Sequence, residues 1–318
     1  MNKRLLTLTL PLAAVSAGAV YMSNKLFNVA FKRVNYVPET SADKQKYADE
    51  YYAYVDWYRQ IPHDTWYLNE NDPDKKLVAS YIPNPADQGK TVIISHGYKG
   101  NRETMANYAK MFYELGFNIL LPDDRAHGDS AGKYINFGWL DRLDYIHWIE
   151  QIIGKNGEDE KILLFGVSMG GATVEMLSGE KLPSQVKAII ADCGYASIRE
   201  ELVYLLHNQY HLPEYPIEPL ISTITKQRLG YYLNDVSSTE QLKKNRRPIL
   251  FIHGGKDTYV PVKMLMKTTP QPRHQSSSGS CATPVMLRVF GTTLLIISTG
   301  LVSFWGLILS RDSVEKGV

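Results

Sequence analysis

From about Thr65 onward, the chain alternates between short apolar runs and longer amphipathic segments. The apolar runs have the length of strands and are predicted as strands at residues 77–82, 91–96, 117–122, 162–167, 187–192 and 248–253. Between them, residues 103–116 and 140–153 place apolar side chains at helical spacing. Parallel strands joined by crossover helices produce this alternation. The pattern therefore predicts an α/β fold with a doubly wound, mostly parallel sheet.

One long insertion interrupts the alternation at about residues 197–242, between two predicted strands. It is rich in Tyr, Leu and Pro and includes the stretch "LVYLLHNQYHLPEYPIEPL". We expect a helical insertion that covers the carboxyl edge of the sheet, where a lid would lie. Its apolar and aromatic composition favours a pocket for an acyl chain over one for a charged ligand.

An uncharged stretch from Leu5 to Met22 follows two basic residues at the N-terminus. The positive flank and the length of the stretch predict a signal anchor or a signal peptide over residues 1–34. The small residues Ala17, Gly18 and Ala19 offer a cleavage site, so both interpretations stay open, with the anchor favoured. The expected location is the cell membrane with an extracellular catalytic domain, or outside the cell after cleavage.

Composition excludes several classes of function. A chain of 318 residues with 44% hydrophobic and 21% charged residues is typical of one globular domain, expected at residues 35–266. A net charge of +2 without a basic run provides no electrostatic surface for nucleic acid. Two cysteines cannot form a disulfide framework. No metal-ligand spacing and no phosphate-binding loop occur, so neither a metal nor a cofactor is expected.

The stretch "ILLFGVSMGGA" at residues 162–172 carries Gly-x-Ser-x-Gly directly after a predicted strand. This context predicts a nucleophile elbow in which Ser168 occupies a strained turn with an exposed hydroxyl. Gly166 and Gly170 would allow the strand and the following helix to approach each other. Ser168 is therefore the candidate nucleophile.

Acyl transfer also needs donors for the oxyanion and an acid that orients the base. The backbone N–H groups of Tyr98 and Met169 are the candidate oxyanion donors, because one follows the nucleophile and the other lies in an earlier strand-end loop. Asp257 follows a later strand end, where the acid belongs.

Several other polar residues at strand ends are interpreted as structural. His96, His127 and His253 are predicted to brace their turns, and Arg125 and Asp129 to form a pair that holds a turn.

A family resemblance rests on four motifs that follow one another along the chain: strand-His-Gly, Arg-x-His-Gly-x-Ser, Gly-x-Ser-x-Gly-Gly and His-Gly-x-x-Asp-x-x-Val-Pro. From about Tyr36 to Met266 the chain resembles the α/β-hydrolase superfamily, in particular membrane-anchored bacterial serine hydrolases of the Bem46 and prolyl-oligopeptidase-like groups. The resemblance implies a serine nucleophile, an Asp-His pair and hydrolysis of a carboxylic ester or related acyl bond. Small peptides are the alternative substrate class.

The base of the implied triad is missing from its usual place. Family members place this histidine further along the chain, after one more strand, often as His-Ala-x-Ser. His274 is the only histidine downstream of Asp257, lies only 17 residues beyond it, and enters the triad by default alone. Its polar surroundings, "TTPQPRHQSSSGS", are typical of solvated coil.

Residues 267–318 also differ in character from the family, because residues 289–310 form a second uncharged stretch of transmembrane length. A real C-terminal membrane helix and a reading-frame error both account for this tail, and the frameshift is favoured. In a shifted frame, the codons of residues 285–290 can encode His-Ala-Glu-Ser-Phe, with the histidine 28 residues after Asp257. The same shift can produce two valines from residues 279–281, within a restored strand.

The tail predicts two consequences for this chain. Its final strand and helix are expected to be missing, which would expose a sheet edge and cause poor folding. Without an imidazole, Ser168 would retain on the order of a thousandth of normal activity or less. The alternative function is therefore an inactive remnant held at the membrane.

Overall fold

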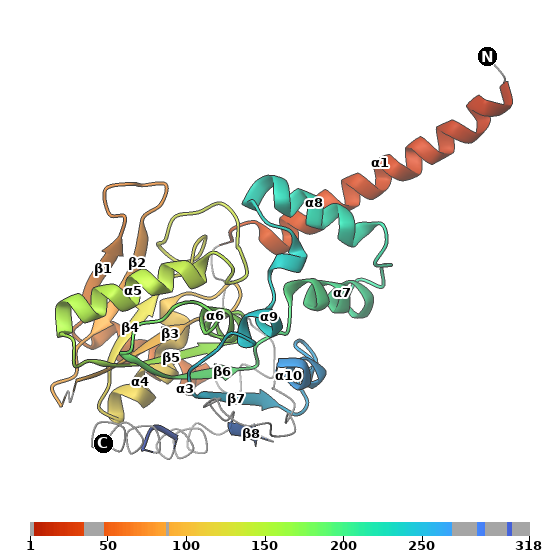
Figure 1. The fold of residues 1–318 in the computed structure, drawn as a ribbon. Coiled ribbons are helices and arrows are strands. Elements are labelled where there is room, and N and C mark those ends of the chain that lie inside the picture. Colours follow the sequence, from red (N-terminus) through yellow and green to blue (C-terminus); the bar gives the residue numbers. More distant parts are fainter. Residues whose placement is uncertain (1–2, 35–47, 87–88, 269–284, 290–303, 307–318) are drawn as a thin grey trace.

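The structure is a computed structural model that describes residues 3–34, 48–86, 89–268, 285–289 and 304–306. Within these residues eight strands form one sheet in the order β1-β2-β4-β3-β5-β6-β7-β8 (Figure 1). The strands are β1 (Asp64–Leu68), β2 (Leu77–Ile82), β3 (Lys90–Ser95), β4 (Asn118–Pro122), β5 (Lys161–Val167), β6 (Val186–Asp192), β7 (Ile249–Gly254) and β8 (Val285–Val289). Strands β4, β3 and β5 to β8 run parallel, whereas β2 pairs antiparallel with both β1 and β4.

Helices cover both faces of this sheet (Figure 1). Helices α3 (Ala48–Gln60) and α4 (Ala106–Glu114) cover one face, and α5 (Asp141–Asn156) and α6 (Met169–Leu177) cover the other. Along β3, Val92 and Ile94 pack on the face covered by α3 and α4, while Ile93 packs on the face covered by α5 and α6. This alternation follows from the two-residue period of a strand. All three side chains are fully buried, which explains the continuous apolar runs in the sequence.

The predicted doubly wound, mostly parallel sheet is confirmed. All six predicted strands match observed strands to within one residue at either end. β1 was missed because it is short and only Trp66 of its five side chains is buried.

The expected helical insertion is also present between β6 and β7. It contains α7 (Ile198–Asn208), α8 (Ile217–Leu229), η2 (Leu233–Asp235) and α9 (Ser238–Leu242), and α10 (Val262–Thr268) follows β7. Helices α7 and α8 lie away from the sheet and beside the end of α1 (Figure 1).

The prediction that the final strand is missing is wrong. Residues Val285–Val289 form β8, which pairs parallel with β7 from Leu250 to Gly254. The run "VMLRV" has strand-forming valines at both ends, but it adjoins the long apolar stretch and was read as part of the aberrant tail. β8 therefore covers the edge of β7 that was expected to be exposed.

Most of the predicted membrane-length stretch at residues 289–310 lies outside the described residues, as do His274 and residues 279–281, where the shifted frame would give two valines. Within that stretch, Phe304 and Trp305 are buried against the core beneath α4. The indole of Trp305 lies 5.2 Å from the ring of Phe117, centroid to centroid. These two side chains thus belong to the hydrophobic core of the α/β domain.

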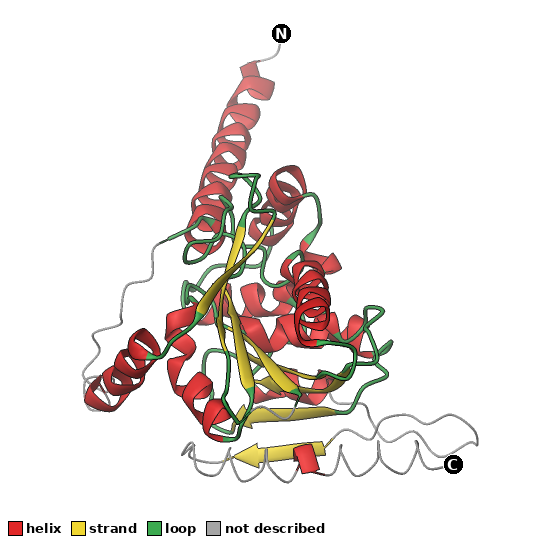
Figure 2. Ribbon diagram, turned by 90° about the vertical axis from the view of Figure 1, so that its left-hand side faces the viewer, coloured by secondary structure: helices red, strands yellow, loops and turns green. Residues whose placement is uncertain are grey.

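The N-terminal segment forms one long helix, α1 (Lys3–Phe31), that extends from the body of the molecule (Figure 2). Its C-terminal end is buried: Phe27 and Phe31 are fully inaccessible, and their rings stack at 4.5 Å. The segment predicted as an anchor or signal therefore also contributes to the core of the α/β domain. Among the described helices, none combines the length and the apolar character that crossing a membrane requires.

Candidate active site

The turn between β5 and α6 holds Ser168 in a conformation that L-residues rarely adopt, with φ 56° and ψ −116°. Two glycines make this turn possible. A Cβ atom at Gly166 would lie 2.1 Å from the carbonyl oxygen of Gly170, and one at Gly170 would lie 2.2 Å from that of Ser95. The sequence motif therefore folds into a tight strand-to-helix turn because no other residue type fits at the two flanking positions.

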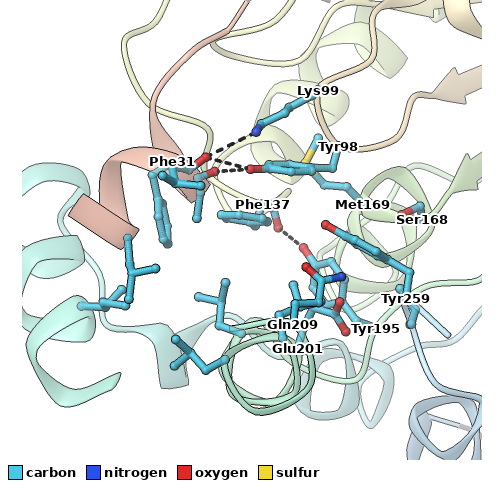
Figure 3. Close-up of a pocket in the computed structure, with 18 of the residues that line it drawn as sticks. Phe31, Tyr98, Lys99, Phe137, Ser168, Met169, Tyr195, Glu201, Gln209 and Tyr259 are labelled. Carbon is cyan, nitrogen blue, oxygen red and sulfur yellow. Dashed lines mark hydrogen bonds between the residues drawn. The ribbon is translucent and has the colours of Figure 1, made fainter. Parts of the chain in front are cut away.

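Ser168 lines a cavity of about 140 Å³ (Figure 3). Its walls include the end of α1, the loop after β3, helix α7 and the turn after β7, and further residues come from the segments after β4 and β6 and from α8. The lining residues are mostly apolar or aromatic and include Leu26, Phe31, Tyr98, Phe137, Met169, Tyr195, Leu202, Leu205, Leu206, Tyr259 and Val260. An apolar cavity of about 150 Å³ accommodates a benzene molecule. The space beside Ser168 therefore suits a small apolar group of about the same size.

The two predicted oxyanion donors lie at the same cavity. Tyr98 and Met169 both line it, together with Ser168. Among the described residues, neither backbone N–H donates a hydrogen bond to the protein, whereas the N–H of the next residue, Lys99, donates to His127 Nε2 at 3.2 Å. Met169 is the first residue of α6, where the helix dipole favours negative charge. Both groups are thus free to bind an anion.

Asp257 lies in the turn after β7 and is fixed by the backbone. Its Oδ1 accepts hydrogen bonds from the N–H groups of Tyr259 and Val260, both at 2.9 Å. The N–H of Ser168 donates to the carbonyl oxygen of Asp192 at 2.8 Å, and the N–H of the next residue, Cys193, donates to that of Ile252 in β7 at 2.8 Å. The nucleophile turn and the strand that leads to Asp257 therefore both bond to the end of β6.

No histidine in the described part of the chain lines the Ser168 cavity. His96 and His127 are buried with both ring nitrogens occupied: His96 Nε2 accepts from Asp124 N–H at 3.0 Å, and its Nδ1 lies 2.8 Å from Gly97 O. Burial lowers the pKa of both imidazoles. They brace their turns as predicted, and neither is available as a base for Ser168.

His253 is likewise buried, but only its Nε2 is occupied, since its Nδ1 has no hydrogen-bond partner among the described residues. Its Nε2 bonds to the carbonyl oxygen of Val260 at 2.8 Å and lies 3.7 Å from Asp257 Oδ2. His253 therefore braces the acid loop, as predicted.

The predicted pairing of Arg125 with Asp129 is wrong. Arg125 forms a bidentate ion pair with Asp144 of α5, at 2.6 and 2.7 Å, and Asp129 pairs with Arg102. The reason is that the fold packs α5 and the segment after β3 against this turn, and these two segments supply partners that are distant in sequence. Each side chain holds the turn to a different element.

Sequence reasoning missed Glu201, a carboxyl group on α7 that lines the same cavity. It is only 4% exposed, and neither carboxylate oxygen has a hydrogen-bond partner among the described residues. Burial, and then the nearby Asp257, raise its pKa to about 8. No pattern signalled this residue, because a Glu in the first turn of a helix is ordinary. Within the described chain, no group of three potential ligands is placed to hold a metal ion.

Part of the chain matches a hydrolase family model, and its fold matches that of a solved esterase. Residues 86–205 match the family model Hydrolase_4, described as serine aminopeptidase, S33. The esterase Pf2001 of Pyrococcus furiosus superposes with a TM-score of 0.59 at 20% identity, covering 88% of this chain and 98% of that one. The chain is an α/β-hydrolase by fold.

Curated relatives match this chain over part of their length. The chain is 34% identical over 185 residues to the uncharacterised protein YqkD of Bacillus subtilis, covering 58% of this chain and 61% of that protein. It is 23% identical over 197 residues to the protein bem46 of Schizosaccharomyces pombe, covering 59% of each. The similarity thus spans about 60% of the length of these relatives. The predicted resemblance to the Bem46 group therefore has a match in sequence.

Proposed function

We propose that this α/β-hydrolase cleaves carboxylic esters of small acyl groups, with Ser168 as the nucleophile. Ser168 Oγ attacks the acyl carbon, the backbone N–H groups of Tyr98 and Met169 bind the oxyanion, and the alcohol leaves. Asp257 orients the imidazole that accepts the proton of the serine. Water then releases the acyl group by the same route.

The observation that carries this proposal is the position of Ser168. It lies in a strained turn, at an apolar cavity, beside two backbone N–H groups that donate to no other described residue. A turn with only a structural role would not need these three features to occur together. The apolar lining favours an uncharged acyl group.

We infer that the missing base is encoded out of frame beyond residue 266. The described residues supply no histidine to the cavity, and the shifted codons of residues 285–290 permit His-Ala-Glu-Ser-Phe. Sequencing the DNA across codons 260–290 tests this inference. Independent reads that return the printed frame would leave only His274 as a base and would reject the frameshift.

Labelling with a fluorophosphonate tests the nucleophile. We expect the frame-restored protein to be labelled and to hydrolyse p-nitrophenyl butyrate, with both signals absent in Ser168→Ala. The chain as printed should react at on the order of a thousandth of that rate, since removal of a triad member leaves little activity. Equal labelling of Ser168→Ala would reject the proposed nucleophile. A restored, folded protein without any labelling would support the inactive remnant.

Peptide hydrolysis is the second candidate function, and Glu201 is the observation that favours it. A buried carboxyl group without a partner is costly, and the ammonium group of an aminoacyl substrate would supply one. Rates on p-nitrophenyl esters and aminoacyl p-nitroanilides separate the two candidates. If Glu201→Gln abolishes anilide cleavage while ester cleavage persists, the enzyme is a peptidase at this site.

We also propose that residues 1–34 hold the protein at the cell membrane with the catalytic domain outside. The basic N-terminal flank and the uncharged stretch from Leu5 to Met22 support this proposal. Cell fractionation of the full chain and of a chain lacking residues 1–19 tests it. Release of the shortened chain from the membrane fraction is expected, whereas equal distribution of both would reject the proposal.

A further inference from the structure

The last turns of α1 form one wall of the Ser168 cavity. Leu26, Val29, Ala30 and Phe31 line it, and Figure 3 shows Phe31 across the cavity from Ser168. Phe31 also packs edge-on against Phe137, with ring centroids 4.9 Å apart. A helix that served only as a tether would not need side chains in the substrate cavity.

Polar contacts fix this end of α1 to the oxyanion loop, which is the loop after β3 that carries Tyr98 and Lys99. Tyr98 Oη donates to the carbonyl oxygen of Ala30 at 2.7 Å, and Lys99 Nζ donates to that of Val29 at 3.4 Å. These carbonyls belong to the last turn of the helix, where no intrahelical donor is available. A lysine at this end also complements the helix dipole.

The lid holds the same helix from its other side. Arg228 of α8 donates to the side-chain oxygens of Asn24 at 2.6 Å and Asn28 at 3.1 Å. Its guanidinium also lies 4.7 Å from the centre of the Phe27 ring. The loop after β3 and the lid therefore hold the end of α1 from two sides.

We propose that the end of α1, through Leu26 and Ala30, determines the length of the acyl group that the enzyme accepts. This inference rests on the proposed function of the Ser168 site. Ala30 has the smallest side chain among the wall residues of α1, and its carbonyl is fixed by Tyr98, so a larger side chain there would occupy cavity space. A shorter side chain at Leu26, which is 9% exposed, would extend the cavity.

The wall lies beyond the small residues Ala17, Gly18 and Ala19 that offer a cleavage site. Removal of the segment up to Ala19 would leave Val20 to Phe31 attached to the domain. The role proposed for α1 is therefore the same for an anchored and for a processed protein.

Binding of neutral aliphatic amides to the full chain tests this role without depending on catalysis. We expect hexanamide to bind at least tenfold more tightly than acetamide, measured from the concentration dependence of the melting temperature. In Ala30→Trp this preference should disappear. Met22→Trp is the matched control, because Met22 lies on the same helix, is 37% exposed and does not line the cavity.

Leu26→Ala provides an independent readout in the opposite direction if Ala30→Trp fails to fold. It should shift the preference toward octanamide, and retention of the wild-type preference in the folded variants would overturn the proposal. So would equal binding of all amides by the wild type. Ser168→Ala should keep the amide preference, so a failure of fluorophosphonate labelling would reject the proposed function and leave this test intact.

Discussion

Two sides of the same cavity are built in different ways. The Ser168 side consists of consecutive residues. At Gly166 and Gly170 the neighbouring backbone is so close that a methyl group would not fit. The α1 side consists of side chains that lie more than a hundred positions before Ser168 in the sequence. Packing and hydrogen bonds from the side chains of Tyr98, Lys99 and Arg228 hold them at the cavity. The position of the nucleophile is therefore set by close backbone packing, which leaves no room for a larger side chain at Gly166 or Gly170. Specificity is held by side chains, which can vary.

The largest expected effect concerns the backbone side. Gly170→Ala should destabilise the protein by more than the ~1–3 kcal/mol of ordinary overpacking, because its Cβ would lie 2.2 Å from the Ser95 carbonyl oxygen. Urea denaturation measures this change. Gly154→Ala is the control: it lies in α5 with nothing within 4 Å of the added Cβ, and should stabilise by up to about 1 kcal/mol. Equal stabilities of the two variants would contradict the prediction.

The next effect concerns the packing of α1. Phe31→Ala removes a fully buried ring and should lower the free energy of unfolding by about 3–5 kcal/mol, because this ring holds the helix in place. Hydrogen exchange should then accelerate in α1 but not in β5, because the two regions are built independently. Val20→Ala changes an exposed position of the same helix and should have no such effect. Uniform acceleration throughout the domain would show that the wall and the core unfold as one unit.

The third effect depends on pH. The pKa of Glu201 is raised to about 8 in the folded state, above the ordinary value of 4.5. The folded state therefore binds this proton more tightly than the unfolded state, and stability from this group is lost as pH rises from about 4.5 through 8. Glu201→Gln should melt a few degrees higher than the wild type at pH 9 and by less at pH 5.

The matched control for this pH dependence is Glu200→Gln, which removes a half-exposed carboxylate from the same helix. Melting curves by circular dichroism across this pH range provide the measurement. A constant difference between Glu201→Gln and the wild type would place the Glu201 carboxylate in water rather than in the cavity wall.

The smallest effect concerns the contact between the two sides. Tyr98→Phe removes the hydrogen bond from Tyr98 Oη to the Ala30 carbonyl and should cost about 0.5–1.5 kcal/mol. The ring stays stacked on Phe137, at a centroid distance of 5.4 Å, so the oxyanion loop keeps its packing. Guanidinium denaturation detects the change. A loss as large as that of Phe31→Ala would mean that this one hydrogen bond, rather than the apolar contacts, holds α1.

Local patterns predicted much of this molecule. The buried strands were found because residues such as Val92 and Ile94 form apolar runs, and the turn at Ser168 because its glycines are adjacent in sequence. The partner of Arg125 was not found, since Asp144 reaches it only through the packing of α5. β8 was missed because its valines adjoin a longer apolar stretch that dominated the pattern.

The sequence by itself determined six of the eight strands, the turn that raises Ser168, and the loops that carry Tyr98 and Asp257, because each depends on residues close together in the chain. Only the tertiary structure decided that Glu201 is buried beside them and that Leu26 and Phe31 close the cavity. The physical reason is that burial and cavity shape depend on contacts between distant segments. Apolar side chains in a helix bury themselves wherever a surface fits, and the pattern alone does not name that surface.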